Sequence, residues 1–510
     1  MRIVIVGGGT AGWLTASIGI TQAPEHTYTV LESSSIGIIG VGESTTGFFT
    51  GLFLDDLKDL GVDHNDFMLR TGATCKLGIR HRGWTPDPTQ SYFGPLDGSS
   101  TQFDRRDSMF KFAVNNLPPE DLITISHTGY LIKHGLSNMN KIPRFTKYGH
   151  AMHVDGTLTG RYLKEHCLKR DNCTHVDSEL LTPIINEQHR ITGLQLANGT
   201  TLEGDLFIDC TGFNRVLIKA MGAKWVSFKQ WLPVDRGMPF LEQYQDTELP
   251  EAWTTAHAQN NGWMWTTPLL DRKGNGYVYS SDHVTDDQAQ DEIELSLGRK
   301  IAPVKVVKFD AGRQDHCWID NCISIGLSSS FLEPLEATSI HTSIVQIKML
   351  FNEYIEPTLD ATVNPGTIKI YNERWRNQLD DLKDFLVMHY QGGRVDTEFW
   401  RYITSGATQT DRVRALLLMS KHHTPSYHDF PIYEGAADWG LYGWVMAGLN
   451  LFKDQPPNTD IEAFVDQNIA YNKLQGSMKA QYGNNLSHDE YIEMFRNMRM
   501  QYTKPGPAAR

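Results

Sequence analysis

The chain has 510 residues, with 47 basic and 60 acidic side chains, so its formal net charge is −13. An acidic chain is poorly suited to coating nucleic acid, because neutralising phosphates requires clustered Lys and Arg. Hydrophobic residues make up 40% and charged residues 21%, which permits a sizeable core and excludes global disorder. The length corresponds to about three domains, or to one large fold with a cap.

The chain opens with the pattern of a strand, a glycine turn, a helix and a second strand. Arg2–Val6 is predicted to be the first strand, Ala11–Thr21 the helix and Tyr28–Glu32 the second strand. The apolar run after Arg2 is only four residues long, too short for the core of a secretion signal. We therefore predict a βαβ unit at the N-terminus.

Gly7, Gly9 and Gly12 form a Gly-x-Gly-x-x-Gly pattern in this turn. Gly7 permits the tight turn, Gly9 lets the backbone approach a pyrophosphate, and Gly12 lets the helix pack on the strand. The helix N-terminus, at Thr10 and Ala11, would then face the phosphates. The pattern predicts a dinucleotide site.

Two carboxylates end predicted strands of this core. Glu32 ends the second strand, where it is suited to accept hydrogen bonds from an adenosine ribose. Asp209 ends the strand Gly204–Ile208; this segment resembles the second FAD-contacting strand of flavoprotein monooxygenases, although alone it is also typical of an ordinary buried strand. No second glycine-turn unit for NAD(P)H is evident, so the combination favours FAD over NAD.

Later segments extend the α/β pattern. Asp155–Lys169 has the apolar spacing of a helix capped by Asp155. Arg190–Leu196 and Thr201–Ile208 alternate around Asn198-Gly199, a strong hairpin signal. We expect further strands at Gly276–Ser280 and Asn321–Gly326, and mainly helices from about Ile340 onward.

Cysteine usage and hydropathy favour a cytoplasmic protein. The six cysteines form no Cys-x-x-Cys pair, so we interpret them as reduced thiols and expect no metal site. The apolar stretch Gly440–Phe452 is too short and too interrupted to span a bilayer, so we expect no membrane association.

Several motifs together resemble flavin-dependent halogenases of the tryptophan-halogenase type, in the same order and similar spacing, from residue 1 to about residue 400. These motifs are Gly7–Leu14, Gly40–Thr45, Gly262–Pro268 with its two tryptophans, Phe331–Ser339, Asp384–Tyr390 and Asp396–Trp400. The resemblance implies a Rossmann-like FAD-binding core of the flavoprotein monooxygenase type over residues 1–340. Segments of the substrate pocket, about 75–150 and 225–260, would interrupt this core, and residues 341–510 would form a mainly helical C-terminal, substrate-binding portion.

The resemblance also assigns the residues of the reaction. Lys76 falls on the family's catalytic lysine and Glu336 on its active-site glutamate. Thr338 and Ser339 match the halide-binding positions, after Ala337, where the family usually has Ser. From the residues alone, Lys76 on a solvated strand face and Glu336 as a structural carboxylate remain alternatives. Glu43, Leu327 and Ile340 would contact the flavin.

The substrate pocket is expected from Phe93, Gly94, Pro95, Trp263, Trp265 and Trp439. Gly94 replaces a histidine found in tryptophan-specific members, and the segment Tyr433–Gly435 offers no clear clamp for an amino-acid zwitterion. The alternative for Trp263 and Trp265 is a core role, because residues two apart share a strand face. Free tryptophan is therefore a doubtful substrate, and an indole or a phenol-like ring is favoured.

The implied activity uses reduced FAD, oxygen and a halide (chloride, bromide or iodide) to give hypohalous acid, which Lys76 and Glu336 direct to a small aromatic substrate. A separate flavin reductase would supply the reduced FAD, and a homo-oligomer is left open. Two alternatives are an FAD-dependent aromatic monooxygenase, which would also lack an NAD(P)H domain, and a flavin-binding protein without activity.

Overall fold

The computed structural model describes residues 1–37, 40, 42–96, 108–141, 144–145, 150–355, 364–430, 437–455 and 461–502. The chain divides into two compact units, each assembled from three segments. Unit 1 comprises Met1–Thr71, Val154–Lys229 and Phe309–Asp380, and unit 2 comprises Gly72–His153, Gln230–Lys308 and Asp381–Arg510. The chain thus leaves unit 1 after residue 71 and again after residue 229, and the last segment of unit 1 ends at residue 380.

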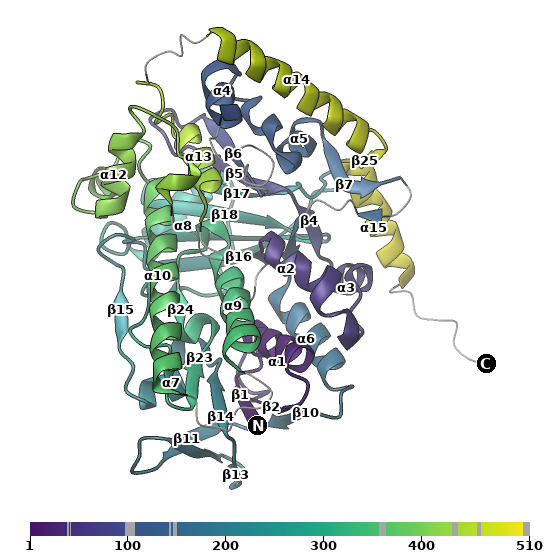
Figure 1. The fold of residues 1–510 in the computed structure, drawn as a ribbon, viewed down its shortest axis with the longest axis vertical. Coiled ribbons are helices and arrows are strands. Elements are labelled where there is room, and N and C mark those ends of the chain that lie inside the picture. The colour runs from purple at the N-terminus through teal and green to yellow at the C-terminus, as the bar shows by residue number, and fades with distance from the viewer. Residues whose placement is uncertain are drawn as a thin grey trace. The chain divides into compact units, whose positions relative to one another are not determined.

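Unit 1 contains a six-stranded sheet in the order β10-β2-β1-β14-β23-β22 (Figure 1). The predicted βαβ unit is confirmed as β1 (Arg2–Val6), α1 (Thr10–Gln22) and β2 (Thr27–Glu32). β1 lies between β2 and β14 (Leu206–Asp209) and is parallel to both. Its residues Ile3–Val6 are buried, as expected for a parallel strand with both faces covered.

The hairpin at Asn198-Gly199 is confirmed, but its second strand is shorter than expected. β12 (Ile191–Leu196) pairs antiparallel with β13 (Thr201–Leu202), and Gly199 adopts a φ of +84° in the turn. The predicted single strand Thr201–Ile208 was wrong, because the chain leaves the hairpin before β14 and then joins the parallel sheet. Alternation cannot show that change of sheet, since β14 has buried apolar residues and the Leu202 side chain of β13 is also partly buried.

Helices complete unit 1. The expected helix with an Asp155 cap is α6 (Gly156–Cys167), and the Asp155 carboxylate accepts from the Leu158 N–H at 2.9 Å. α9 (Thr338–Met349) begins the expected helical part of the chain. The remaining elements of unit 1 include α2 (Gly47–Gly51), α3 (His64–Thr71), β10 (Cys173–Asp177), β11 (Leu180–Ile185), α7 (Val216–Ala220), β15 (Trp225–Ser227), β21 (Gly312–Gln314), β22 (Trp318–Ile319), β23 (Cys322–Ser324) and β24 (Ser330–Phe331).

Unit 2 contains a seven-stranded sheet in the order β20-β16-β19-β18-β17-β5-β6. Its strands are β5 (Gly78–Arg82), β6 (Ser91–Pro95), β16 (Arg236–Gln243), β17 (Trp253–Ala258), β18 (Gly262–Pro268), β19 (Arg272–Tyr279) and β20 (Val307–Lys308). One line of paired residues crosses five strands on one face: Tyr92, His81, Ala256, Trp265 and Gly276. The indole of Trp265 lies over Gly276, where a Cβ would be 2.0 Å from a ring carbon, so only glycine fits.

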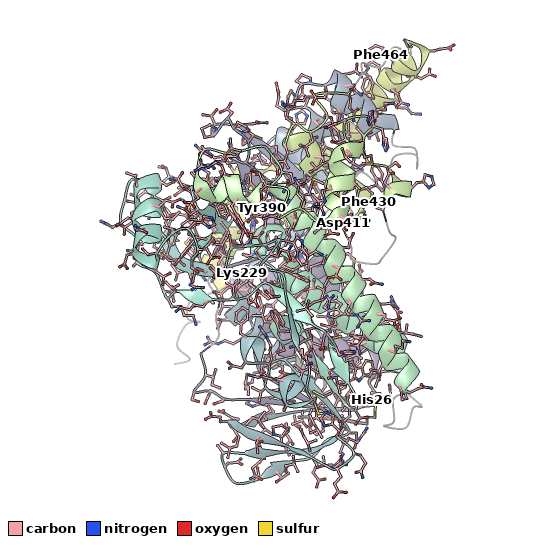
Figure 2. All side chains as sticks on the ribbon, turned by 90° about the vertical axis from the view of Figure 1, so that its left-hand side faces the viewer. His26, Lys229, Tyr390, Asp411, Phe430 and Phe464 are labelled. Carbon is pink, nitrogen blue, oxygen red and sulfur yellow. The ribbon has the colours of Figure 1, made fainter. Side chains whose placement is uncertain are left out.

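A second strand pair in unit 2 joins β4 (Thr74–Lys76) to β9 (Ala151–Val154) in an antiparallel ladder. The C-terminal portion is mainly helical, as predicted. Helices and further strands of unit 2 are α4 (Ser108–Asn116), α5 (His127–Lys133), β7 (Leu136–Asn140), α8 (Asp286–Leu297), α11 (Glu398–Ile403), α12 (Asp411–Met419), α13 (Trp439–Gly448), α14 (Ile461–Tyr482), β25 (Asn485–Ser487) and α15 (His488–Tyr502). Phe464 is a partly exposed residue of α14 (Figure 2).

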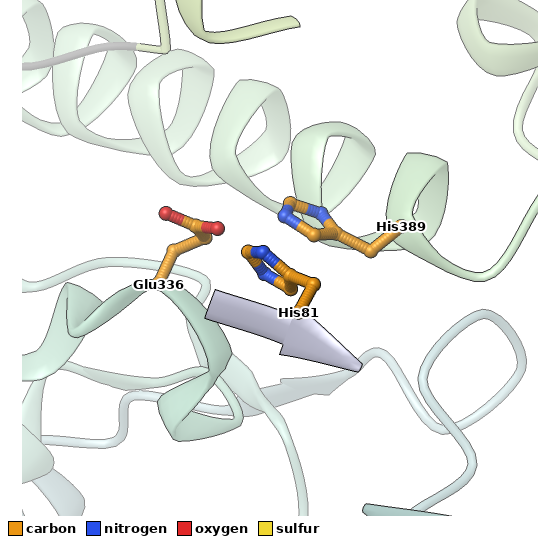
Figure 3. Close-up of side chains that lie close together, drawn as sticks. All are labelled: His81, Glu336 and His389. Carbon is orange, nitrogen blue, oxygen red and sulfur yellow. The ribbon is translucent and has the colours of Figure 1, made fainter. Parts of the chain in front are cut away.

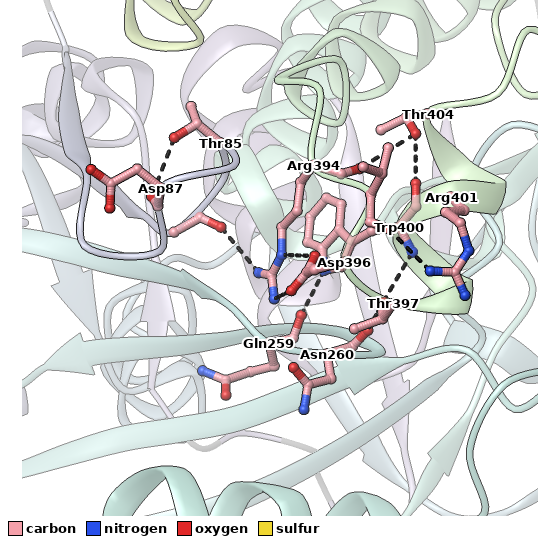
Figure 4. A network of polar contacts seen from close by, with 12 residues as sticks. Thr85, Asp87, Gln259, Asn260, Arg394, Asp396, Thr397, Trp400, Arg401 and Thr404 are labelled. Atoms are coloured by element: carbon pink, nitrogen blue, oxygen red, sulfur yellow. Dashed lines mark hydrogen bonds and ion pairs between the residues drawn. The ribbon is translucent and has the colours of Figure 1, made fainter.

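The segment Asp396–Trp400 is fastened to the sheet of unit 2 by a polar network (Figure 4). The Arg394 guanidinium pairs with Asp396 at 2.7 Å and donates to the Gly83 carbonyl at 3.0 Å. The Trp400 indole N–H donates to the Gln259 carbonyl at 2.7 Å. Arg394 and Trp400 thus each satisfy a main-chain carbonyl just after the end of a strand, β5 and β17 respectively. Among the described residues, no helix is long and apolar enough to cross a membrane.

Candidate active site

The glycine turn of unit 1 has the close packing that the sequence predicted. Gly7 has a φ of +116°, and a Cβ there would lie 2.2 Å from the Cys210 carbonyl oxygen. A Cβ at Gly12 would lie 1.8 Å from the Gly7 carbonyl oxygen, whereas a Cβ at Gly9 would meet no atom of the described residues within 4 Å. No side chain caps α1 at Gly9. The turn therefore leaves an open cradle at a helix N-terminus, which fits a pyrophosphate.

Glu32 stands beside this cradle at the end of β2. Its carboxylate pairs with the Lys164 ammonium and lies 2.8 Å from Nε2 of His175. A Cβ at Gly8 would collide with the Glu32 side chain, so the carboxylate lies directly against the glycine turn. The carboxylate is partly exposed, as an acceptor for a ribose requires.

Asp209 is buried and its carboxylate is occupied within the protein. It accepts from the N–H and the hydroxyl of Thr211, and from the N–H groups of Leu217 and Ile218, at 2.7–2.9 Å. Four hydrogen bonds saturate the two oxygens. Asp209 therefore stabilises the turn that follows β14.

The other predicted flavin residues also lie in unit 1. The Glu43 carboxylate accepts from the Gly156 N–H at 2.7 Å, and the Thr10 hydroxyl donates to the Gly156 carbonyl at 3.1 Å. The first bond ties the start of α6 to Glu43, and the second ties it to the start of α1. Ala11 lies against Gly326, where a Cβ would be 2.8 Å from that of Ala11. Leu327 and Ile340 are both partly exposed.

Glu336 ends the 3-10 turn Pro334–Glu336 and is half-buried (Figure 3). Ala337 follows with a φ of +57°, an uncommon conformation for a residue with a side chain, and α9 starts at Thr338. The N-cap residue of α9 is Ala337, whose side chain offers no group that could cap the helix. The buried Thr338 hydroxyl has no hydrogen-bond partner among the residues that the structure describes, and Ser339 beside it is half-buried. Uncapped N–H groups and an unused hydroxyl fit an anion.

Lys76 lies on β4 in unit 2 and has no exposed side-chain surface. The structure therefore excludes the alternative of a lysine on a solvated strand face. A fully buried lysine is rare unless it is paired or functional, because burial disfavours the ammonium form.

Five of the six expected pocket residues lie on the two faces of the seven-stranded sheet of unit 2. Gly94, Trp263 and Trp265 share one face; the two indoles are 6.5 Å apart between ring centroids. Phe93 and Pro95 alternate with Gly94 and therefore point to the opposite face, where the Phe93 ring contacts Trp253 at 5.1 Å. Trp439 is buried at the start of α13. Tyr433–Gly435 lies outside the described residues.

Gly94 does not occupy a turn. It is paired with Ile79 within β6, and its φ is not in the left-handed region, so a backbone requirement for glycine is excluded.

Sequence reasoning missed a pair of buried histidines on the Gly94 face. His81 stacks on Tyr92 with ring centroids 4.7 Å apart, and His389, at the end of α10 (Pro365–His389), lies 5.2 Å from His81 (Figure 3). Nδ1 of His389 lies 2.9 Å from the Phe385 carbonyl. The sequence could have indicated His81, because it lies on the strand that follows Lys76 directly. Residues 79 and 81 of that strand alternate with residues 78 and 80 and therefore share one face.

The parallel strands and the glycine turn define the class of fold, a Rossmann-like α/β fold of the kind that binds dinucleotides. The family model for tryptophan halogenases matches residues 2–455. The chain is 30% identical to the 7-chloro-L-tryptophan 6-halogenase KtzR of Kutzneria sp. (strain 744), covering 97% of this chain and 100% of that protein. The chain belongs to the tryptophan halogenase family and is a flavin-dependent halogenase.

Solved structures agree with this assignment. The tryptophan halogenase from Shewanella frigidimarina NCIMB 400 superposes with a TM-score of 0.87 at 26% identity, covering 99% of this chain and 98% of that chain. Tar14, a tryptophan C-6 flavin-dependent halogenase (chlorinase) from taromycin biosynthesis, gives a TM-score of 0.85 at 27% identity, with 97% and 99% covered. The similarity extends over almost the whole chain, so it includes both units.

Proposed function

We propose that the chain halogenates an electron-rich aromatic ring, indole- or phenol-like, with Lys76 and Glu336 as the catalytic residues. The observation that carries the proposal is the complete burial of Lys76 on β4. Membership of the halogenase family supplies the reaction class. Burying a lysine lowers the stability of the folded chain, because the charged form loses its hydration, and β4 has only three residues.

Unit 1 would hold the flavin and the halide. Gly7, Gly9 and Gly12 would cradle the pyrophosphate of FAD, and Glu32 would accept from its ribose. Thr338 and Ser339 would bind the halide through the N–H groups that start α9. When FAD is bound in its reduced form, it and oxygen together supply the oxidant that converts the halide to hypohalous acid.

Lys76 would direct the hypohalous acid to the ring. An ammonium at Nζ donates a hydrogen bond to the acid oxygen and polarises the O–X bond, where X is the halogen, while a neutral amine would take up X to become a haloamine. In the overall step a ring C–H bond breaks, a C–X bond forms, and the hydroxyl of the acid leaves as water. Burial excludes bulk water, which would otherwise dissipate the oxidant.

Glu336 would stabilise the positive charge that develops on the ring and accept the departing ring proton. Its half-buried carboxylate, on a turn fixed by Pro334 and Ala337, is suited to general base work.

Free tryptophan is not the substrate that the Gly94 face favours. The relatives named above are tryptophan halogenases by their names. Gly94, in contrast, leaves open space beside His81, where a Cβ would meet, among the described residues, only Cε1 of His81 at 4.0 Å. Such space suits a bulkier arene.

The decisive test combines the purified chain, FAD, NADH and a separate flavin reductase with chloride, bromide or iodide and a panel of indoles and phenols. Mass spectrometry should find halogenated products that depend on the halide and on the reductase. Oxygen insertion without halide would instead identify a monooxygenase, and peroxide without any product from the whole panel would identify a non-catalytic flavoprotein. Rapid NADH oxidation by the chain alone would contradict the need for a reductase.

A further inference from the structure

His153 is a fully buried histidine on β9, the strand that pairs with the Lys76 strand. Thr74 lies directly opposite His153, and Lys76 lies directly opposite Ala151. Residues two apart on a strand share a face, so Thr74, Lys76, Ala151 and His153 lie on the same face of this ladder. Lys76 and His153 are therefore diagonal neighbours, within reach of a long side chain.

Both nitrogens of the His153 imidazole meet threonine hydroxyls. Nδ1 lies 3.0 Å from the Thr74 hydroxyl, and Nε2 lies 3.0 Å from the Thr254 hydroxyl. The Thr74 hydroxyl donates its only hydrogen to the Pro268 carbonyl at 2.5 Å. It must therefore accept from His153, which places the proton on Nδ1. In the neutral ring Nε2 is then an acceptor, and it receives the hydrogen of Thr254.

This chain of hydrogen bonds connects the two strand systems of unit 2. Thr254 belongs to β17 and Pro268 ends β18, and both strands are part of the seven-stranded sheet. Thr254 is two residues from Ala256, so it lies on the face that carries Trp265 and His81. The imidazole thus joins the Lys76 strand to the sheet that carries the predicted substrate face.

The imidazole is also held in its uncharged form. Burial lowers the pKa of His153 well below its ordinary value, and the positive charges of Lys76 and His488 lower it further. A protonated ring would carry a hydrogen on Nε2 and would force the Thr254 hydroxyl to find another acceptor. A neutral ring adds no repulsion to the ammonium of Lys76.

We propose that His153 is a positioning residue for Lys76, which joins the lysine strand to the seven-stranded sheet as a neutral imidazole with its proton on Nδ1. The inference rests on the proposed role of Lys76. The hydrogen-bonded imidazole fixes the register and orientation of β4. Nζ of Lys76 is therefore held at the position from which it delivers the halogen to the ring.

The test compares His153→Phe, which removes both bonds, with His153→Gln, which keeps one donor or acceptor at the end of the side chain. In His153→Phe the rate of halogenation should fall by about tenfold or more, since misplacement by about 1 Å has such effects. KM for the aromatic substrate and peroxide release from reduced FAD should change by less than about threefold. His153→Gln should recover a substantial part of the rate. Thr254→Val, which conserves shape, should show a smaller loss of the same kind.

The matched control is His127→Phe. His127 is also a buried histidine of unit 2, and its Nδ1 lies 2.7 Å from the Tyr482 hydroxyl. It lies on α5, however, and not on the β4–β9 ladder that carries Lys76. This variant should lose thermal stability without a selective loss of halogenation. If His153→Phe and His127→Phe lose halogenation and melting temperature in parallel, His153 is only structural and the proposal fails.

A spectroscopic measurement tests the tautomer directly. Long-range nitrogen–proton NMR correlations of histidine-labelled enzyme, with His153 assigned by its loss in His153→Gln, should show the Nδ1–H tautomer and no titration from about pH 6 to 8. An Nε2–H tautomer, or titration near the ordinary histidine pKa, would overturn the proposal. Lys76→Met distinguishes a failure of the proposed role of Lys76 from a failure of the proposed role of His153. If Lys76→Met still halogenates, the role of Lys76 is wrong. If Lys76→Met is inactive while His153→Phe is fully active, only the role of His153 is rejected.

Discussion

A Cβ at Gly94 would lie 4.0 Å from Cε1 of His81 on the neighbouring strand and would meet no other described atom within that distance. The strand pair β5–β6 therefore has room for a side chain at position 94, on the face that also carries Trp263 and Trp265. His81 itself is fully buried. An imidazole introduced at Gly94 would enter this space beside an imidazole already present.

Gly94→His should narrow the range of substrates. The new ring would fill the space beside His81, so activity on bulky arenes should fall more than activity on a small phenol or indole. The expected loss is at least about tenfold for the bulkiest accepted substrate, comparable to filling a pocket by several methylene groups. Relative kcat/KM values over a substrate panel measure it, with peroxide release from reduced FAD unchanged.

Gly94→Ala is the control for backbone effects. Its Cβ makes an ordinary contact and the φ of residue 94 suits any residue, so the melting temperature and the substrate profile should stay close to those of the parent. An unchanged profile in Gly94→His with an unchanged melt would show that position 94 does not border the substrate.

Lys76→Met should abolish halogenation while FAD binding and peroxide release continue. Methionine fills most of the volume of the buried lysine stem, so this change removes the amine without a large cavity, and Lys76→Ala adds the cavity for comparison. Product formation and flavin oxidation are measured in the same reaction. Near-normal halogenation by either variant would remove Lys76 from the mechanism.

Glu336→Gln should slow substitution by about 10²–10⁴-fold, the range expected for the loss of a group that accepts a proton. Glutamine keeps the shape of the side chain, so the turn before α9 and halide-dependent oxidation of reduced flavin should be retained. Single-turnover product formation from preformed hypohalous acid isolates this step. A rate within a few-fold of the parent would reassign Glu336 to a structural role.

Asp381→Asn should change the pH dependence of stability. Burial raises the pKa of Asp381 to about 6, although Arg412 at 3.7 Å lowers it in part; Asp384 and Lys383 are the other charged neighbours. A raised folded pKa means that the native state binds this proton more tightly than the unfolded chain. The associated stability is present below the unfolded pKa, near 4, and is lost as the pH rises through 6.

The uncharged amide removes that loss. Asp381→Asn should therefore stabilise unit 2 by roughly 1–3 kcal/mol near pH 7 and by about a third of that near pH 4.5, seen as a gain in melting temperature that grows with pH. Asp411→Asn on α12, a residue labelled in Figure 2, is the comparison for the same substitution at an exposed carboxylate, because the Asp411 side chain is 98% exposed. A pH-independent difference for Asp381→Asn would contradict the assigned burial.

Local patterns were enough to predict the dinucleotide-binding opening. The βαβ unit, the glycine turn and the Asp155 cap depend on contacts between residues near in sequence, and their expected positions are confirmed to within a residue or two. The motif order around Lys76 and Glu336 likewise identified the family, because the chemistry restricts residue types at fixed places in the chain.

Tertiary structure decided what local patterns leave open. A strand's alternation gives two faces but not which partner covers each, so Phe93 and Pro95 were grouped with Gly94 although they lie on the other face. The sequence placed Lys76 on a strand, but only the packing shows that its side chain is fully buried. Likewise, only the structure shows that His153 lies on the strand paired with β4 and that Thr254 is hydrogen-bonded to His153, although both residues are far from Lys76 in sequence. Such contacts arise from pairing between distant strands, and the hydrogen bond that fixes an imidazole tautomer exists only after that pairing has formed.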